Sequence, residues 1–130
     1  MIIQSEYSLQ FTTNSRKYCR DYKKPSYHYE TFEIHVKKTG SYVLWSKSEI
    51  DTYGYLYKDD FDPFQPFGNL IDQHGGKCNQ GQLKFTRNFD ENTKYILVIT
   101  TYYPNTTGNF TILISGENNV TMNRFRMCIY

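Results

Sequence analysis

The sequence lacks the features that mark several classes of protein. It has no apolar run near the length of a membrane span. Its net charge is only +2 and its basic residues are scattered, so it has no basic stripe of the kind that binds nucleic acid. It contains no G-x-S-x-G, no H-E-x-x-H and no P-loop, and we expect neither an enzyme nor a required cofactor.

The start of the chain, MIIQSEYS, also lacks the parts of a signal peptide, which are a basic n-region and a long apolar h-region. If the protein is secreted, we therefore expect this chain to be a mature or excised piece.

Cysteine is scarce, and its spacing excludes a C-x-x-C zinc or redox motif. The three residues Cys19, Cys78 and Cys128 permit three single disulfides, each leaving one thiol over. We expect a Cys19–Cys78 disulfide, because both residues lie in predicted loops. Cys128 then becomes a candidate for an intermolecular disulfide. The alternative is a cytosolic protein with three reduced thiols.

What the chain does have is tyrosine, at 13 residues, and alternation of β-formers with polar residues. The segment SYVLWSKSEIDTYGYLY, residues 41–57, has the pattern of two half-buried antiparallel strands. Segment 93–102 is almost wholly apolar or β-branched, which predicts a strand buried on both faces. We expect strands at 7–12, 27–36, 41–47, 50–57, 82–87, 93–102, 109–115 and from 120 onward, with a short one at 69–71. This pattern predicts a single domain over 1–130, an all-β, antiparallel, jelly-roll-like sandwich of seven to eight strands.

A family resemblance covers most of residues 5–116. The motifs IDTYGYLY, GNLI, a Gly-Gly loop and TKYILVITTYYPNTTGNFTILISG resemble the bacterial pre-peptidase C-terminal type of domain, which occurs in modular extracellular proteins of bacteria and invertebrates. The resemblance implies a small jelly-roll sandwich without enzymatic activity, and some members bind calcium or polymers. Where the family carries an acidic run before its Gly-Gly, this chain reads DQHGG and keeps only Asp72. Asp51 matches the family's Asp at a strand start, where it braces the neighbouring loop.

Two kinds of metal or catalytic site can be weighed. Calcium needs six or more oxygen ligands, and the candidates are Asp51, Asp59, Asp60, Asp62 and Asp72. Asp also forms turns with its own backbone, which is the competing explanation. A catalytic pair of His74 and Cys78 would need a depressed thiol pKa and an orienting third group, and nothing in the sequence points to either.

Two kinds of surface feature complete the list of candidates. Tyr53, Tyr55 and Tyr57 form one stripe that either binds a polymer or packs inside the sandwich. Three N-x-S/T sequons, at Asn105, Asn109 and Asn119, lie in or beside predicted turns and predict N-glycosylation.

The ends of the chain decide the functional hypothesis. Segments 1–6 and 120–130 alternate like strands, so they either close their own sheets or pair with a neighbouring subunit. We expect a non-enzymatic structural module at the cell surface or outside the cell. Its partners would be copies of itself or neighbouring extracellular domains, and strand exchange between them would yield a fibril. The alternative is a module that binds carbohydrate or another polymer, with calcium as an aid.

Overall fold

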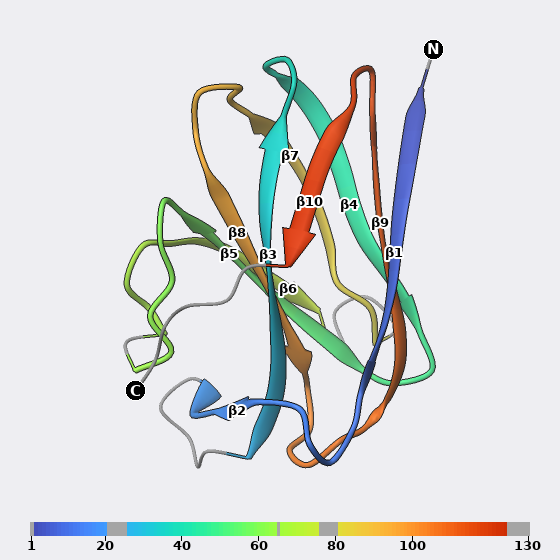
Figure 1. Ribbon diagram of the computed structural model, residues 1–130, viewed down its shortest axis with the longest axis vertical. Coiled ribbons are helices and arrows are strands. Elements are labelled where there is room, and N and C mark those ends of the chain that lie inside the picture. The colour runs from blue at the N-terminus through green and yellow to red at the C-terminus, as the bar shows by residue number, and fades with distance from the viewer. Residues whose placement is uncertain (1, 21–25, 65, 76–80, 125–130) are drawn as a thin grey trace.

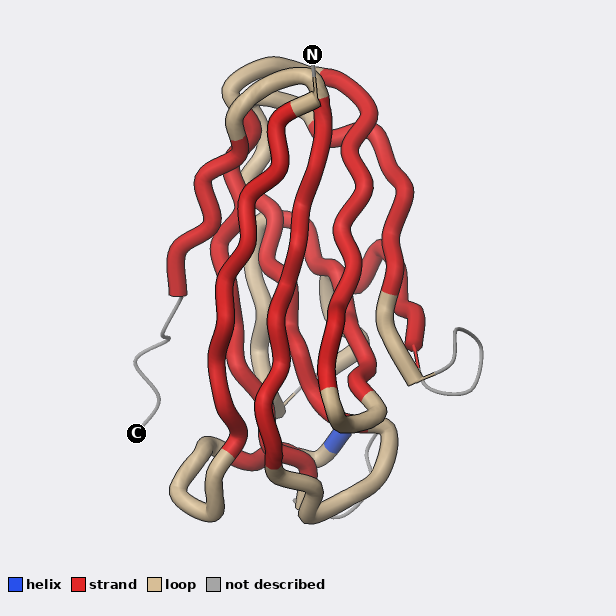
Figure 2. Tube along the Cα trace, turned by 90° about the vertical axis from the view of Figure 1, so that its right-hand side faces the viewer, coloured by secondary structure: helices blue, strands red, loops and turns tan. Residues whose placement is uncertain are grey.

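A computed structural model describes residues 2–20, 26–64, 66–75 and 81–124, and it forms a β-sandwich (Figures 1 and 2). Two antiparallel sheets pack face to face, which confirms the predicted fold class. These residues contain ten strands rather than seven or eight. The additions are a two-residue strand in the predicted basic loop and a longer strand than expected near residue 70. The described residues contain no helix long and apolar enough to cross a membrane.

The smaller sheet has four strands in the order β1-β9-β4-β7. Its strands are β1 (Ile3–Phe11), β9 (Gly108–Gly116), β4 (Gly40–Ser48) and β7 (Lys84–Phe89). The β1 and β9 strands pair without a register shift over nine residues, from Ile3 opposite Gly116 to Phe11 opposite Gly108.

The larger sheet has six strands, five of them in the order β10-β3-β8-β5-β6. They are β10 (Val120–Arg124), β3 (Tyr27–Val36), β8 (Tyr95–Thr101), β5 (Thr52–Lys58) and β6 (Leu70–Gly75). The sixth strand, β2 (Lys17–Tyr18), pairs with the start of β3. Most consecutive strands alternate between the two sheets, which gives the jelly-roll-like connectivity.

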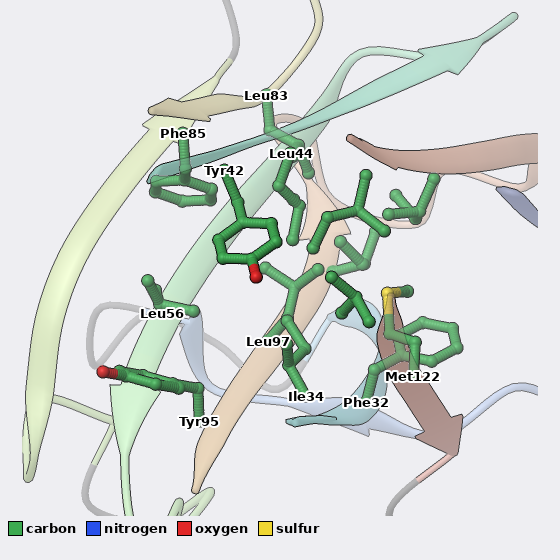
Figure 3. Close-up of a cluster of buried hydrophobic side chains, with 14 of the residues drawn as sticks. Phe32, Ile34, Tyr42, Leu44, Leu56, Leu83, Phe85, Tyr95, Leu97 and Met122 are labelled. Atoms are coloured by element: carbon green, nitrogen blue, oxygen red, sulfur yellow. The ribbon is translucent and has the colours of Figure 1, made fainter. Parts of the chain in front are cut away.

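The main core fills the space between the sheets (Figure 3). Leu44 and Phe85 from the smaller sheet point toward Leu56 and Leu97 from the larger one, and all four are buried. At Gly54, an added Cβ would lie 2.9 Å from Leu83 Cδ2 and 3.0 Å from Phe85 Cε2. The glycine at this position therefore reflects the close approach of the two layers.

A second hydrophobic cluster covers the other face of the larger sheet. Its members are mostly aromatic: Tyr18, Tyr27, Tyr29, Tyr55, Tyr57, Phe61, Ile96 and Val98. Tyr18 comes from β2, at the margin of this sheet, and Phe61 comes from the β5–β6 loop, so a side chain of the sheet itself and one from a loop pack together on this face. Every residue of β8 is buried as a result, which confirms the expectation that this strand is covered on both faces.

Candidate functional site

The predicted tyrosine stripe does not form a binding surface. Tyr55 is 2% exposed and Tyr57 is fully buried, because both pack in the second cluster. The Tyr57 hydroxyl donates to the Pro66 carbonyl at 2.5 Å, which fixes the β5–β6 loop over the sheet. Only Tyr53 is partly exposed, and the Arg20 guanidinium lies 5.0 Å from its ring. The stripe therefore stabilises the fold, and a polymer-binding role for its three residues together is wrong for this structure.

The five candidate calcium ligands do not converge either. The described residues contain no group of three or more His, Cys, Asp or Glu placed to hold a metal ion. Asp60 and Asp62 accept hydrogen bonds from nearby backbone N–H groups, at 2.8 and 2.9 Å, and Asp59 adopts a positive φ of 72°. Asp72 accepts from the Gln73 N–H and pairs with an arginine, while Asp51 lies in the β4–β5 turn. They act mainly as turn formers, which was the competing explanation.

The expected Cys19–Cys78 disulfide is not formed, because Cys19 is a half-buried free thiol. The chain next to it is held without a covalent bridge. Arg20 donates to the Thr101 carbonyl at 3.0 Å, and its guanidinium lies 4.7 Å from the centre of the Tyr27 ring. Cys78 and Cys128 lie outside the described residues, so the structure tests neither the disfavoured catalytic pair of His74 and Cys78 nor the intermolecular thiol at Cys128.

The three sequon asparagines are all exposed. Asn105 lies in the β8–β9 turn with a φ of 54°, and Asn119 lies in the β9–β10 turn. Asn109 is in β9, opposite Gln10, on the outer face of the smaller sheet. Each has the exposure that a glycan needs, and their glycosylation stays a prediction.

Both terminal segments pair within the chain. Residues 3–11 form β1 against β9, and residues 120–124 form β10 against β3. Residues 125–130 lie outside the described part. The ends therefore close the two sheets, and each becomes an edge strand on the same side of the sandwich (Figure 1).

The opposite side, where β6 and β7 are the edge strands, is closed by polar contacts. The Lys84 backbone N–H at the start of β7 donates to His74 Nδ1 of β6 at 3.1 Å. An ion pair joins Arg87 of β7 to Asp72 of β6, with 3.4 Å between Nη1 and Oδ2. These contacts join the two edges to each other, and the charged residues of β7 discourage pairing with a further strand.

On the β10 side, a buried carboxylate links three segments. Glu30 of β3 is 7% exposed and binds Arg124 of β10 and, at 3.1 Å, Arg16 before β2. Its Oε1 also accepts from the Thr31 N–H at 3.2 Å. We call Arg16, Glu30 and Arg124 the arginine clasp. It lines a hollow of about 220 Å³ beside the end of β1, which is smaller than the roughly 300–1,000 Å³ of most ligand pockets.

The free edge of β1 has none of these protections. Within the described residues, β9 is the only strand that pairs with β1. The strand has nine residues, no proline, no register shift and one charged side chain, Glu6. Edge strands are normally blunted by proline, by lysine, by bulges or by being short. The β1 edge is therefore the strongest candidate for an interaction site in the described part of the molecule.

The outer face of the smaller sheet is a second surface that no segment covers within the described part of the chain. The only tryptophan, Trp45, is partly exposed there, with Lys84 and Leu113 opposite it on the two neighbouring strands. Val43 and Lys47 flank it along β4, and hydroxyl and amide residues occupy most of the remaining outward positions of the sheet: Gln4, Ser8, Gln10, Ser41, Thr86, Asn88, Asn109, Thr111 and Ser115. An aromatic ring among hydroxyls and amides is a surface on which a polymer with polar groups can stack.

In comparisons with known proteins, no family model matches the chain, and no curated protein matches it either.

Sequence reasoning missed the arginine clasp and underestimated Trp45. One signal for the clasp was present in YHYETFEIHV, where Glu30 falls in phase with the apolar residues Phe32 and Ile34, which are buried in the structure. A carboxylate in the buried phase of a strand requires a cationic partner. Arg16 and Arg124 lie far from Glu30 in the sequence, so periodicity alone did not identify them.

Proposed function

We propose that the protein is a non-enzymatic structural module, a building block of a surface or extracellular assembly that is joined through strand edges. The observation that carries this proposal is the free edge of β1, a nine-residue strand without the usual protections. A neighbouring strand that adds to this edge would pair its backbone hydrogen bonds along the whole length. Repeated pairing that does not close would produce a fibril.

The placement of the sequons supports the extracellular part of the proposal. The three asparagines are exposed at two turns and on one sheet face, and none lies on β1. The resemblance to the pre-peptidase C-terminal type of domain is consistent with the same role. Glycosylation of the sequons is tested by the intact mass of protein from a secretory host, measured before and after enzymatic deglycosylation. A mass that does not change on deglycosylation would argue against a glycoprotein.

Self-association is tested by sedimentation velocity over a range of protein concentrations, followed by negative-stain microscopy. The proposal predicts a concentration-dependent shift to dimers or larger assemblies. A particle that stays monomeric at the highest concentration would contradict it. Non-reducing conditions are compared with reducing ones, so that assembly through strands is separated from assembly through cysteines.

The second candidate function is polymer binding, and the observation that favours it is the uncovered face around Trp45. Its ring and the neighbouring hydroxyl and amide groups would stack on and hydrogen-bond to a polysaccharide. A pull-down on insoluble polysaccharides, with and without a chelator, tests it. Trp45→Ala should abolish retention, whereas Tyr103→Ala, which removes an exposed aromatic in the β8–β9 turn, should not. Equal retention of both variants would argue against this site.

A further inference from the structure

We infer that a second copy of this chain occupies the β1 edge, with the two β1 strands antiparallel about a two-fold axis through Tyr7. This inference rests on the proposed function and specifies the partner and the register of that same edge. The result is one continuous eight-stranded sheet, in which the order of the smaller sheet is repeated in reverse in the second copy. A pair formed in this way is isologous and closes as a dimer.

The partner must bring an edge that is itself free, and this consideration favours a second β1. The β7 edge is tied to β6 through His74 and the Asp72–Arg87 pair. The described part of the β10 strand runs from Val120 to Arg124, and Arg124 is held in the clasp. Among the described strands, β1 alone combines length with an open edge. Two such edges would pair their free backbone N–H and C=O groups with each other along their whole length.

The pleat restricts the possible registers. In β1 the odd residues face the core side, and the even residues Gln4, Glu6, Ser8 and Gln10 are exposed on the outer face. Directly opposed residues of a sheet point to the same face, so odd residues must oppose odd ones. The two-fold axis must therefore pass through a residue, and not between two residues.

Two independent criteria then select Tyr7. With the axis at Tyr7, all nine residues from Ile3 to Phe11 find a partner, whereas any other centre leaves some of them unpaired. With the axis at Glu6, the two Glu6 carboxylates would oppose each other directly, and like charges in that arrangement destabilise a sheet. The axis at Tyr7 avoids this, because each Glu6 lies opposite Ser8 of the other copy.

The same register matches the side chains on both faces. On the outer face Gln4 opposes Gln10 of the second copy, so the two amides can exchange hydrogen bonds. On the core side Ile3 opposes Phe11, Ser5 opposes Leu9, and the two Tyr7 rings meet at the axis. Tyr7 and Leu9 are only partly buried in the single copy, so pairing would cover the apolar surface that they leave exposed.

Intermolecular disulfide trapping tests the register. Protein carrying Gln4→Cys is mixed with protein carrying Gln10→Cys, and both sites are exposed, so the fold tolerates the changes. Directly opposed Cα atoms lie about 4.5–5.5 Å apart, within disulfide reach. After mild oxidation, mapping of non-reduced peptides should find the 4–10 link as the main new cross-link. Wild-type protein reports any links through its three native cysteines.

Ser8→Cys alone is the matched off-register control. In the proposed register the two Ser8 residues are diagonal neighbours, about 7–8 Å apart and outside easy disulfide reach. We expect at least tenfold less cross-linking than for the mixed pair. A dominant 8–8 link, or a dimer by sedimentation with no 4–10 link, would overturn this inference and leave the structural role intact. A monomer at every concentration would overturn both.

Discussion

The two lateral sides of the sandwich differ in how their edge strands are satisfied. On one side β6 and β7 are tied together by His74 and by the Asp72–Arg87 ion pair. On the other side β10 is held by the arginine clasp, while the edge of β1 beside it has no strand partner within the described residues. Chain ends that close sheets leave edges behind, and among the described strands the edge of β1 is the longest without a proline, a lysine or a contact that joins it to another edge strand.

The two outer faces show the same contrast. The larger sheet is covered by its own loops through a cluster rich in tyrosine, so its aromatic side chains are used internally. The smaller sheet carries the partly exposed Trp45 and no covering segment among the described residues. Composition alone cannot separate these uses. Tyrosine is abundant and mostly internal here, while the partly exposed aromatic on the outer face of the smaller sheet is the single tryptophan.

The largest effect on stability is expected from the clasp. Glu30→Ala removes a buried carboxylate that binds two guanidinium groups and a backbone N–H. Hydrogen bonds to charged groups contribute about 1.5–3 kcal/mol, so we expect a loss of about 2–3 kcal/mol, with β10 detaching first. Urea unfolding measures the loss and hydrogen exchange in β10 locates it. Glu33→Ala, an acid on the other face of β3, is the control, and an equal loss there would contradict the clasp.

A smaller loss of stability is expected at Tyr42, a core residue in the inner strand β4, which serves as a comparison for the changes at the edge strands. Its hydroxyl donates to the Lys38 carbonyl at 2.6 Å, so Tyr42→Phe should cost about 1 kcal/mol at neutral pH. Burial, and then the nearby carboxylates of Glu117 and Glu91, raise the pKa of Tyr42 above its ordinary value of 10.0.

This pKa shift predicts an alkaline signature. The unfolded chain loses the Tyr42 proton as the pH passes about 10, while the folded protein retains it until the raised pKa is reached. The contribution of Tyr42 to stability is therefore complete below pH 10 and declines above it. Tyr42→Phe should fall less steeply than wild type between pH 10 and 11.5 in urea unfolding. Tyr103→Phe, at an exposed site, should follow wild type; parallel curves for all three proteins would argue against the shift.

The contact between His74 of β6 and Lys84 of β7 should contribute less to stability than the arginine clasp. His74→Ala removes the acceptor for the Lys84 N–H, and that edge can rebond to water, so we expect a loss of only about 0.5–1 kcal/mol. The Asp72–Arg87 ion pair then remains as a polar tie between β6 and β7, so the β7 edge is more open and association should extend beyond the dimer in sedimentation velocity. Thr86→Ala, on the exposed face of β7, is the control. A variant whose assembly matches wild type would show that His74 does not protect this edge.

Much of the fold could be predicted from period-two alternation. The pattern in 27–36 matches β3 residue for residue, and the apolar segment 93–102 correctly indicated a strand buried on both faces. Strand β2 was missed because a strand of two residues is too short to show an alternation of apolar and polar side chains. The burial of Tyr55 and Tyr57 was left open, because alternation separates two faces of a strand but does not say which of them is covered.

The candidate site was harder to predict, since it depends on contacts that sequence distance hides. The alternation of 1–11 predicted a strand that either closes its own sheet or joins a neighbour, and β1 closes the sheet while leaving one edge free. Which edges are protected depends on His74 meeting Lys84 and on Glu30 meeting Arg124, and these pairs form only after folding. The disulfide expectation failed for the same reason, because residue type was known and placement was not.

The central claim is that two β1 strands pair with Glu6 opposite Ser8, and a charge exchange at Ser8 tests it most directly. Ser8→Lys and Ser8→Glu lose the same hydroxyl contact with Thr111 and present opposite charges to Glu6 of the other copy. Each cross-strand charge pair contributes about 0.5 kcal/mol and the dimer contains two, so Kd should change about fivefold in each direction. In sedimentation velocity, the account predicts that Ser8→Lys tightens the dimer and Ser8→Glu weakens it. Equal dissociation constants for the two variants, or a weaker dimer with lysine, would contradict the account.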